Sequence, residues 1–377
     1  MILDSISTNA LILDCIASNV PILDFSGSNN LILDTVAIND LILDSIGAND
    51  LILVGIVTNV LIVDNIGTHV MILNSNFNDD LFMDIIGTNS LILDRICSNG
   101  LMLDSICTND LILDNICTND LILESIETNE LILDSITAND LILFIICSND
   151  MMLNSIRTND LNVILNSTGT NDLILDTVGT NDLILATIHS YSLMLYSICT
   201  NYLILDSICT NELILYSIGT NDLILDGIGT NDLILYSVGT NNLILDIICN
   251  NGLMLNTICT NDMILGNIGT NDLILCSMRT NDLIQVRIGT NVLILDSICC
   301  NDLILDNICI NDLIQYSIVT NDLTLNSVET NDLILDIIFS NDLMLNIICI
   351  NTLILHIIDT KDLILEIIGT IDLILGG

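Results

Sequence analysis

The chain has 377 residues, of which 51% are hydrophobic, 3% are aromatic and none is tryptophan. It carries 48 acidic and only five basic residues, for a formal net charge of −43, and the basic residues are scattered singly. No basic patch is therefore available for direct binding to nucleic acid phosphates, and this much isoleucine and leucine argues against an intrinsically disordered acidic chain.

A ten-residue unit, L-I-L-D-S-I-G-T-N-D, repeats from Met1–Ala10 to Leu373–Gly377, and its residues are numbered here as positions 1 to 10. A short fixed period indicates a repeat protein in which each unit contacts mainly its neighbours. Because the composition does not shift along the chain, we expect one repeat solenoid over residues 1–377.

Within each unit, in chain order, we predict a short strand at positions 1–3, a corner at positions 4–5, a second short face around position 6 and another corner at positions 7–10. The apolar positions 1, 2, 3 and 6 would spread around most of a helix, whereas the isoleucine content and the turn residues favour strands. Strands this short are stable only when stacked. We therefore predict an all-β fold, a parallel β-solenoid (β-helix) in which equivalent residues form rows about 4.8 Å apart.

The number of repeats in each coil is indicated by tyrosines that alternate with aspartates at position 4. They are Tyr196, Asp206, Tyr216, Asp226, Tyr236 and Asp246. This twenty-residue sub-period favours two repeats per coil, with the tyrosines stacked on one side. The other interpretation is a duplication of a twenty-codon block of DNA.

The repeat slips once, within residues 161–172, where the unit LNVILNSTGTND is two residues too long. We predict a bulged corner that leaves the solenoid intact; a kink is the alternative. Farther along, Asn221–Leu225 and Asp226–Thr230 resemble the units of the pentapeptide-repeat proteins, and the resemblance implies a four-sided coil with five residues to a face. That family has a small residue two places before its central leucine, where this chain has Asn or Asp. A register with positions 1, 3, 6 and 8 inward fits burial better.

Substitutions between units show which rows face water. Positions 4 and 7 accept charged, aromatic and small residues, so these rows are exposed. Positions 1, 2, 3 and 6 stay apolar, and their exceptions are Pro21, Ser26, Asn76, Gln285, Gln315 and Thr324. Position 2 either forms an apolar stripe outside the coil or turns into a corner. The nearly constant Asn of position 9 fits a corner, with left-handed backbone and a ladder of stacked amides.

Little in the chain indicates catalysis. Of the 14 cysteines, 11 occupy the variable position 7 and none forms a CxxC pair, and the three histidines lie far apart. No phosphate-binding loop or nucleophile motif occurs, so we expect no enzyme.

The aspartate rows at positions 4 and 10 are the one strong chemical feature, because neighbouring carboxylates repel. We expect weak divalent-cation binding, for example of Ca²⁺, by such rows; a solvated acidic face is the alternative. Representative candidates are Asp104, Asp110, Asp114, Asp120, Asp226 and Asp232.

The expected function is that of a non-enzymatic acidic repeat protein with a structural or surface-binding role and lateral self-association through the isoleucine rows. Alternatives are an acidic DNA mimic that binds a basic protein, an ice-binding protein with threonine rows, and an expanded DNA repeat with little selected function. The mean hydropathy is +0.74, but the apolar runs are too short to span a membrane. No secretion signal is visible, so we expect the cytoplasm by default.

Overall fold

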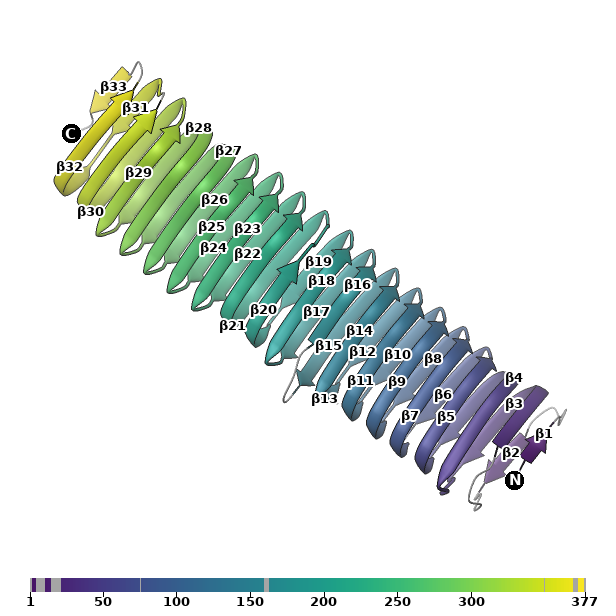
Figure 1. The fold of residues 1–377 in the computed structure, drawn as a ribbon. Helices are drawn as coiled ribbons and strands as arrows, with labels where there is room; N and C mark the ends of the chain where they lie inside the picture. The colour runs from purple at the N-terminus through teal and green to yellow at the C-terminus, as the bar shows by residue number, and fades with distance from the viewer. Residues whose placement is uncertain are drawn as a thin grey trace. The chain divides into compact units, whose positions relative to one another are not determined.

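The structure is a computed structural model that describes residues 2–4, 11–14, 22–74, 76–158, 163–348, 350–368 and 372–375. It comprises two compact units, an N-terminal unit, Met1–Tyr191, and a C-terminal unit, Ser192–Gly377. In each unit the described strands stack as successive coils (Figure 1). No helix among the described residues has the length and apolarity that crossing a bilayer requires.

The strands of the N-terminal unit follow the repeat. They are β1 Ile2–Asp4, β2 Leu11–Asp14, β3 Ile22–Asp34, β4 Asp40–Val54, β5 Val57–Gly67, β6 Val70–Asn74, β7 Phe77–Gly87, β8 Ser90–Asp94, β9 Cys97–Cys107, β10 Asp110–Asp114, β11 Cys117–Glu127, β12 Glu130–Asp134, β13 Thr137–Ala138, β14 Asp140–Cys147, β15 Asp150–Thr158, β16 Val163–Gly169, β17 Asp172–Gly179 and β18 Asp182–His189.

The strands of the C-terminal unit have the same origin. They are β19 Ser192–Tyr196, β20 Cys199–Asp206, β21 Glu212–Gly229, β22 Asp232–Gly239, β23 Asn242–Cys249, β24 Gly252–Cys259, β25 Asp262–Gly269, β26 Asp272–Arg279, β27 Asp282–Cys299, β28 Asp302–Val319, β29 Asp322–Glu329, β30 Asp332–Ile348, β31 Thr352–Leu355, β32 Ile358–Ile368 and β33 Asp372–Leu375.

Strand pairing confirms a parallel β-solenoid with two decapeptides in each coil. Leu111 of β10 pairs with Leu91 of β8 and with Leu131 of β12, each two decapeptides away. The same spacing holds in the C-terminal unit, and the described parts of both units together contain about 17 turns. Because one decapeptide is half a coil, odd and even repeats form separate rows on different sides of the coil.

The core consists of the rows at positions 1, 3, 6 and 8. In one repeat Leu111, Leu113 and Ile116 are at most 1% exposed, and the hydroxyl-bearing Thr118 is 6% exposed. This is the inward register that the sequence favours over the pentapeptide-repeat alignment. Position 2 lies between two inward leucines in the middle of a strand, so Ile112 points outward and is partly exposed. The position 2 rows therefore form the outer stripe and are not turned into a corner.

The prediction of left-handed backbone at position 9 is wrong for the described residues. Positive φ angles occur instead at position 5, for example 55° at Ser105 and 53° at Ile247. The corner after position 4 reverses within one residue, and Ser105 Oγ donates to Asp104 Oδ1 at 3.1 Å across it. The corner at position 9 is supported by side-chain hydrogen bonds and needs no left-handed residue there.

The slip in the repeat appears as one longer coil. Leu141 pairs with Val163, which lies two positions beyond the usual partner, and Val163 then pairs with Leu183 at the ordinary spacing of two decapeptides. The inserted corner itself, residues 159–162, lies outside the described residues, so its shape stays a prediction. Pro21 also lies outside them, and the side chain of Ser26 is not described.

Candidate functional site

The L-I-L strands present one recurring surface, formed by the outward rows at positions 10, 2 and 4 and called here the strand face. On β10 its members are Asp110, Ile112 and Asp114, which alternate with the buried Leu111 and Leu113. Each coil has two strand faces, because the two repeats of a coil form separate rows. Each face therefore has an apolar row in the middle and an acidic row on either side.

The structure places the predicted carboxylates in different rows. Each of the six is flanked, one coil before and one coil after, by the residues of its own row. The triplets are Asp84–Asp104–Glu124, Ser90–Asp110–Glu130, Asp94–Asp114–Asp134, Gly100–Asp120–Asp140, Asp206–Asp226–Asp246 and Glu212–Asp232–Gly252. Asp104 and Asp114 belong to opposite repeats of a coil, so they do not meet.

Carboxylates in these rows crowd one another without converging on a common point. Among the described residues, no group of three or more His, Cys, Asp or Glu side chains is arranged to hold a metal ion. The pKa of Asp114 is raised, first by partial burial and then by Asp134 and Asp94, while Asn115 and Arg95 oppose the rise. Cation binding thus stays a prediction, and any bound cation would bridge pairs of carboxylates.

A long acidic row of the C-terminal unit was not singled out by sequence reasoning. It contains six successive aspartates at position 10. They are Asp262, Asp282, Asp302, Asp322, Asp342 and Asp362. Partial burial, Asp282 and Asp322 raise the pKa of Asp302. Comparing every second repeat of the sequence would have found this row.

Acidic rows are interrupted in places by side chains that form hydrogen bonds with a neighbouring carboxylate. Asn242 Nδ2 donates to Asp222 Oδ1 at 2.6 Å, and Asn326 Nδ2 donates to Asp306 Oδ1 at 2.8 Å. His356 Nδ1 lies 2.6 Å from Asp336 Oδ1. These contacts replace carboxylate repulsion with a hydrogen bond, so the substitutions in the rows relieve part of the charge.

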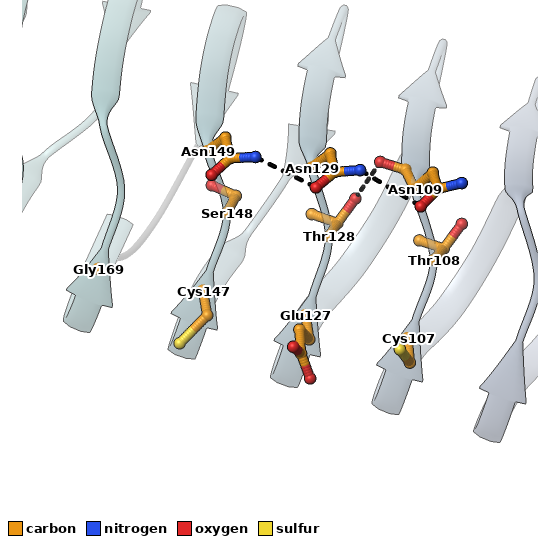
Figure 2. Close-up of a pocket in the computed structure, with 10 residues that line it drawn as sticks. All are labelled: Cys107, Thr108, Asn109, Glu127, Thr128, Asn129, Cys147, Ser148, Asn149 and Gly169. Atoms are coloured by element: carbon orange, nitrogen blue, oxygen red, sulfur yellow. Dashed lines mark hydrogen bonds between the residues drawn. The ribbon is translucent and has the colours of Figure 1, made fainter.

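The corner at positions 7, 8 and 9 lines an open cavity of about 320 Å³, with the residues of position 9 exposed and those of position 8 buried beneath them (Figure 2). Asn129 Nδ2 donates to Asn109 Oδ1 at 3.2 Å, and Asn149 Nδ2 donates to Asn129 Oδ1 at 3.1 Å, which is the predicted amide ladder. Thr128 Oγ1 lies 2.8 Å from the Asn109 carbonyl oxygen and 2.9 Å from that of Glu130. The threonine hydroxyl is therefore used inside the coil, and this row offers no exposed surface for matching an ice lattice.

The predicted tyrosine stack is confirmed. Tyr196, Tyr216 and Tyr236 are row neighbours in the C-terminal unit. The rings of Tyr216 and Tyr236 are stacked, with centroids 5.2 Å apart and planes 2° apart, whereas Tyr196 is tilted by 56° against Tyr216. The rings stay partly exposed, with Tyr216 43% and Tyr236 37% exposed.

The described cysteines are free thiols, and most of them are exposed at position 7. Cys15 and Cys349 lie outside the described residues. His69, His189 and His356 lie in different coils, as their spacing in the sequence predicts. Comparison of the chain with family models, with curated proteins and with solved structures finds no match.

Proposed function

We propose that the protein is a structural repeat protein that associates laterally with copies of itself through the strand faces, and that divalent cations such as Ca²⁺ promote this association. The observation that supports the proposal is the nearly continuous apolar row at position 2 between two acidic rows. It recurs on both repeats of the coil, so one chain offers many equivalent contacts.

The apolar row is accessible enough to contribute to an interface. Met152 and Ile264 are each 42% exposed, and Phe82 is 41% exposed. In the N-terminal unit an open groove of about 350 Å³ runs between Ile132 and Met152 on one side and the carboxylates of Glu130 and Asp150 on the other. Contiguous apolar surface of this kind is typical of contact sites, whereas single exposed side chains are not.

Charge sets the condition for association. Within one row, carboxylates about 4.8 Å apart already repel by roughly 1 kcal/mol even at the dielectric constant of water. When two strand faces meet, their acidic rows meet as well, and this adds to the repulsion. Summed over several coils, this opposes the burial of the apolar rows. Cations that bridge carboxylates of the two copies remove the opposition, so the interface is both apolar and cation-dependent.

Sedimentation velocity tests the proposal. We expect a monomer at low ionic strength, and larger species when Ca²⁺ is added, compared with Na⁺ at matched ionic strength. The double variant Ile132→Lys/Met152→Lys places charge in the apolar row and should raise severalfold the protein concentration at which association begins. Gly67→Lys/Gly87→Lys adds the same charge at position 7, where both glycines have open space, and should leave association unchanged. A chain that stays monomeric with Ca²⁺ at high concentration contradicts the proposal.

The second candidate function is an acidic module that binds a basic protein, and the row from Asp262 to Asp362 favours it. The coil has about 20 residues, with two inward residues in each five-residue segment. The resemblance to pentapeptide-repeat proteins implies the same arrangement, so a relationship to that family is part of this second proposal. A basic DNA-binding protein should bind the chain and be displaced by duplex DNA. Binding should weaken in Asp282→Asn/Asp302→Asn/Asp322→Asn, and equal binding by this variant would count against the row as the contact.

A further inference from the structure

Two cysteines that occupy the same position in alternate repeats are direct neighbours in the N-terminal unit. Cys97, the first residue of β9, pairs in register with Cys117, the first residue of β11. Both occupy the outward position 7; Cys117 is exposed and Cys97 is partly exposed. We propose that these thiols form a dithiol site, which a low-molecular-weight disulfide such as oxidised glutathione converts into a disulfide that joins successive coils.

The spacing of the strands fits this chemistry. Adjacent strands lie about 4.8 Å apart, which falls within the range of Cα separations in disulfides, about 4.4–6.8 Å. Parallel in-register side chains keep their Cβ atoms near that same separation, slightly above the usual range of about 3.5–4.5 Å. The bond would therefore form with some strain and stay open to reduction by thiols, which makes the modification reversible.

The surroundings of the two sulfur atoms suggest the order of events. Partial burial raises the pKa of the Cys97 thiol, and the neighbouring Cys117 thiol raises it further, through charge and a hydrogen bond. Cys117 has the greater exposure, so it meets a dissolved reagent first. Cys97 is then held next to it as the second thiol.

The reaction balances as two thiol–disulfide exchanges. The Cys117 thiolate attacks one sulfur of oxidised glutathione, forms a mixed disulfide and releases one glutathione thiolate. The Cys97 thiolate then attacks the Cys117 sulfur, forms the Cys97–Cys117 bond and releases the second glutathione. The two protons lost by the cysteines end on the two glutathione thiols, so the protein is oxidised by two electrons and the reagent is reduced by two.

The other position 7 cysteines provide internal controls. Within the described residues, every other pair of position 7 cysteines in one row has at least one different residue of that row between its members. The two thiols of such a pair are therefore at least two strand spacings apart. The sets with a single intervening residue are Cys107–Glu127–Cys147, Cys209–Gly229–Cys249 and Cys259–Arg279–Cys299. Figure 2 shows the first of them, with Glu127 between the two thiols. Two strand spacings, about 9.6 Å, are too far for a disulfide.

The experiment treats the fully reduced chain with oxidised glutathione, quenches with acid and counts thiols after unfolding. We expect the count to fall from 14 to 12, because two thiols join (14 − 2). Digestion before aspartate residues should then yield a cross-linked pair of peptides, residues 94–103 with residues 114–119, and added reduced glutathione should release them.

Variants separate this site from general thiol reactivity. Cys97→Ser should stop at a stable mixed disulfide on Cys117, because the second thiol is missing. Cys147→Ser should still form the Cys97–Cys117 bond at the rate of the unaltered chain. The proposal is overturned if glutathione adds equally to all exposed cysteines with no 94–103/114–119 cross-link, or if Cys97→Ser and the unaltered chain give the same products.

Discussion

Two glutamines lie inside the core of the C-terminal unit, at position 3, where most repeats have leucine. Gln285 stands in its row between Leu265 and Leu305, and Gln315 stands between Leu295 and Leu335. Both side chains are 0% exposed, and neither the oxygen nor the nitrogen of either amide has a hydrogen-bond partner.

We expect Gln285→Leu and Gln315→Leu to stabilise the unit. An unsatisfied buried polar group costs roughly 1–3 kcal/mol, and each glutamine has two such groups. Leucine has one heavy atom fewer than glutamine, so the small space it leaves offsets about 1 kcal/mol of the gain. The two groups together cost about 2–6 kcal/mol, so the net gain is about 1–5 kcal/mol for each substitution. With a urea dependence of ~2 kcal/mol/M this moves the unfolding midpoint of the unit upward by ~0.5–2.5 M.

The assay is urea unfolding followed by far-UV circular dichroism, together with amide hydrogen exchange of the peptides around residues 283–288 and 313–318. Exchange is included because repeat arrays can unfold in parts, and a global midpoint is then not a complete measure. Leu225→Gln is the matched control, because Leu225 lies in the same row as Gln285, several coils away. It should lower stability by a similar amount.

The reasoning would be refuted by a Gln285→Leu protein with unchanged or lower stability while Leu225→Gln is clearly destabilised. That pair of results would mean that the native glutamine amides are satisfied, for example by each other across the core.

Three further predictions concern the corners and the acidic rows. Ile247 has a φ of 53°, which β-branched residues rarely adopt, so Ile247→Asn should raise stability by about 1 kcal/mol in thermal unfolding, whereas Ile244→Asn in the extended strand should not. Thr128→Val keeps the shape but removes the hydroxyl bonded to backbone carbonyl oxygens; it should cost about 1–2 kcal/mol and speed amide exchange in its own coil. The pKa of Asp302 is raised above 3.8 in the folded protein, so protonation of this carboxyl group increases the free energy of unfolding. The increase is fully present below pH 3.8 and is lost as the pH rises through the folded-state pKa. Asp302→Asn should therefore melt at a higher temperature than the unaltered chain at pH 7, and a lower melting temperature would contradict this sign.

Much of the architecture could be predicted from local patterns. The alternation of Leu111, Ile112 and Leu113 identifies the inner and outer sides of a strand, because successive side chains point to opposite faces. Tolerance of charge at positions 4 and 7 identifies exposed rows. The alternation of tyrosine with aspartate at position 4 indicated two repeats per coil, and Tyr216 and Tyr236 are indeed neighbours.

The backbone conformation at the corners and the contacts between rows depend on how the coil closes. A single repeat does not contain this information. The backbone turns through a left-handed residue at position 5, as at Ser105, and not at the asparagine of position 9. Coil closure also decides that Asp104 and Asp114 lie in different rows.

What the sequence by itself determined is the period, the parallel β-solenoid and the sides of its rows, because strand alternation and burial act over a few neighbouring residues. What only the tertiary structure decided is that the coil does close after two decapeptides, because the alternation of tyrosine with aspartate favoured this length but a duplication of DNA could also explain it. The contact of Cys97 with Cys117 and the acidic row through Asp302 both require a coil that closes after two decapeptides. The length of that coil is set by the width that eight inward rows of leucine, isoleucine and threonine, four from each repeat, need to fill the core, and this is a property of the packed coil as a whole.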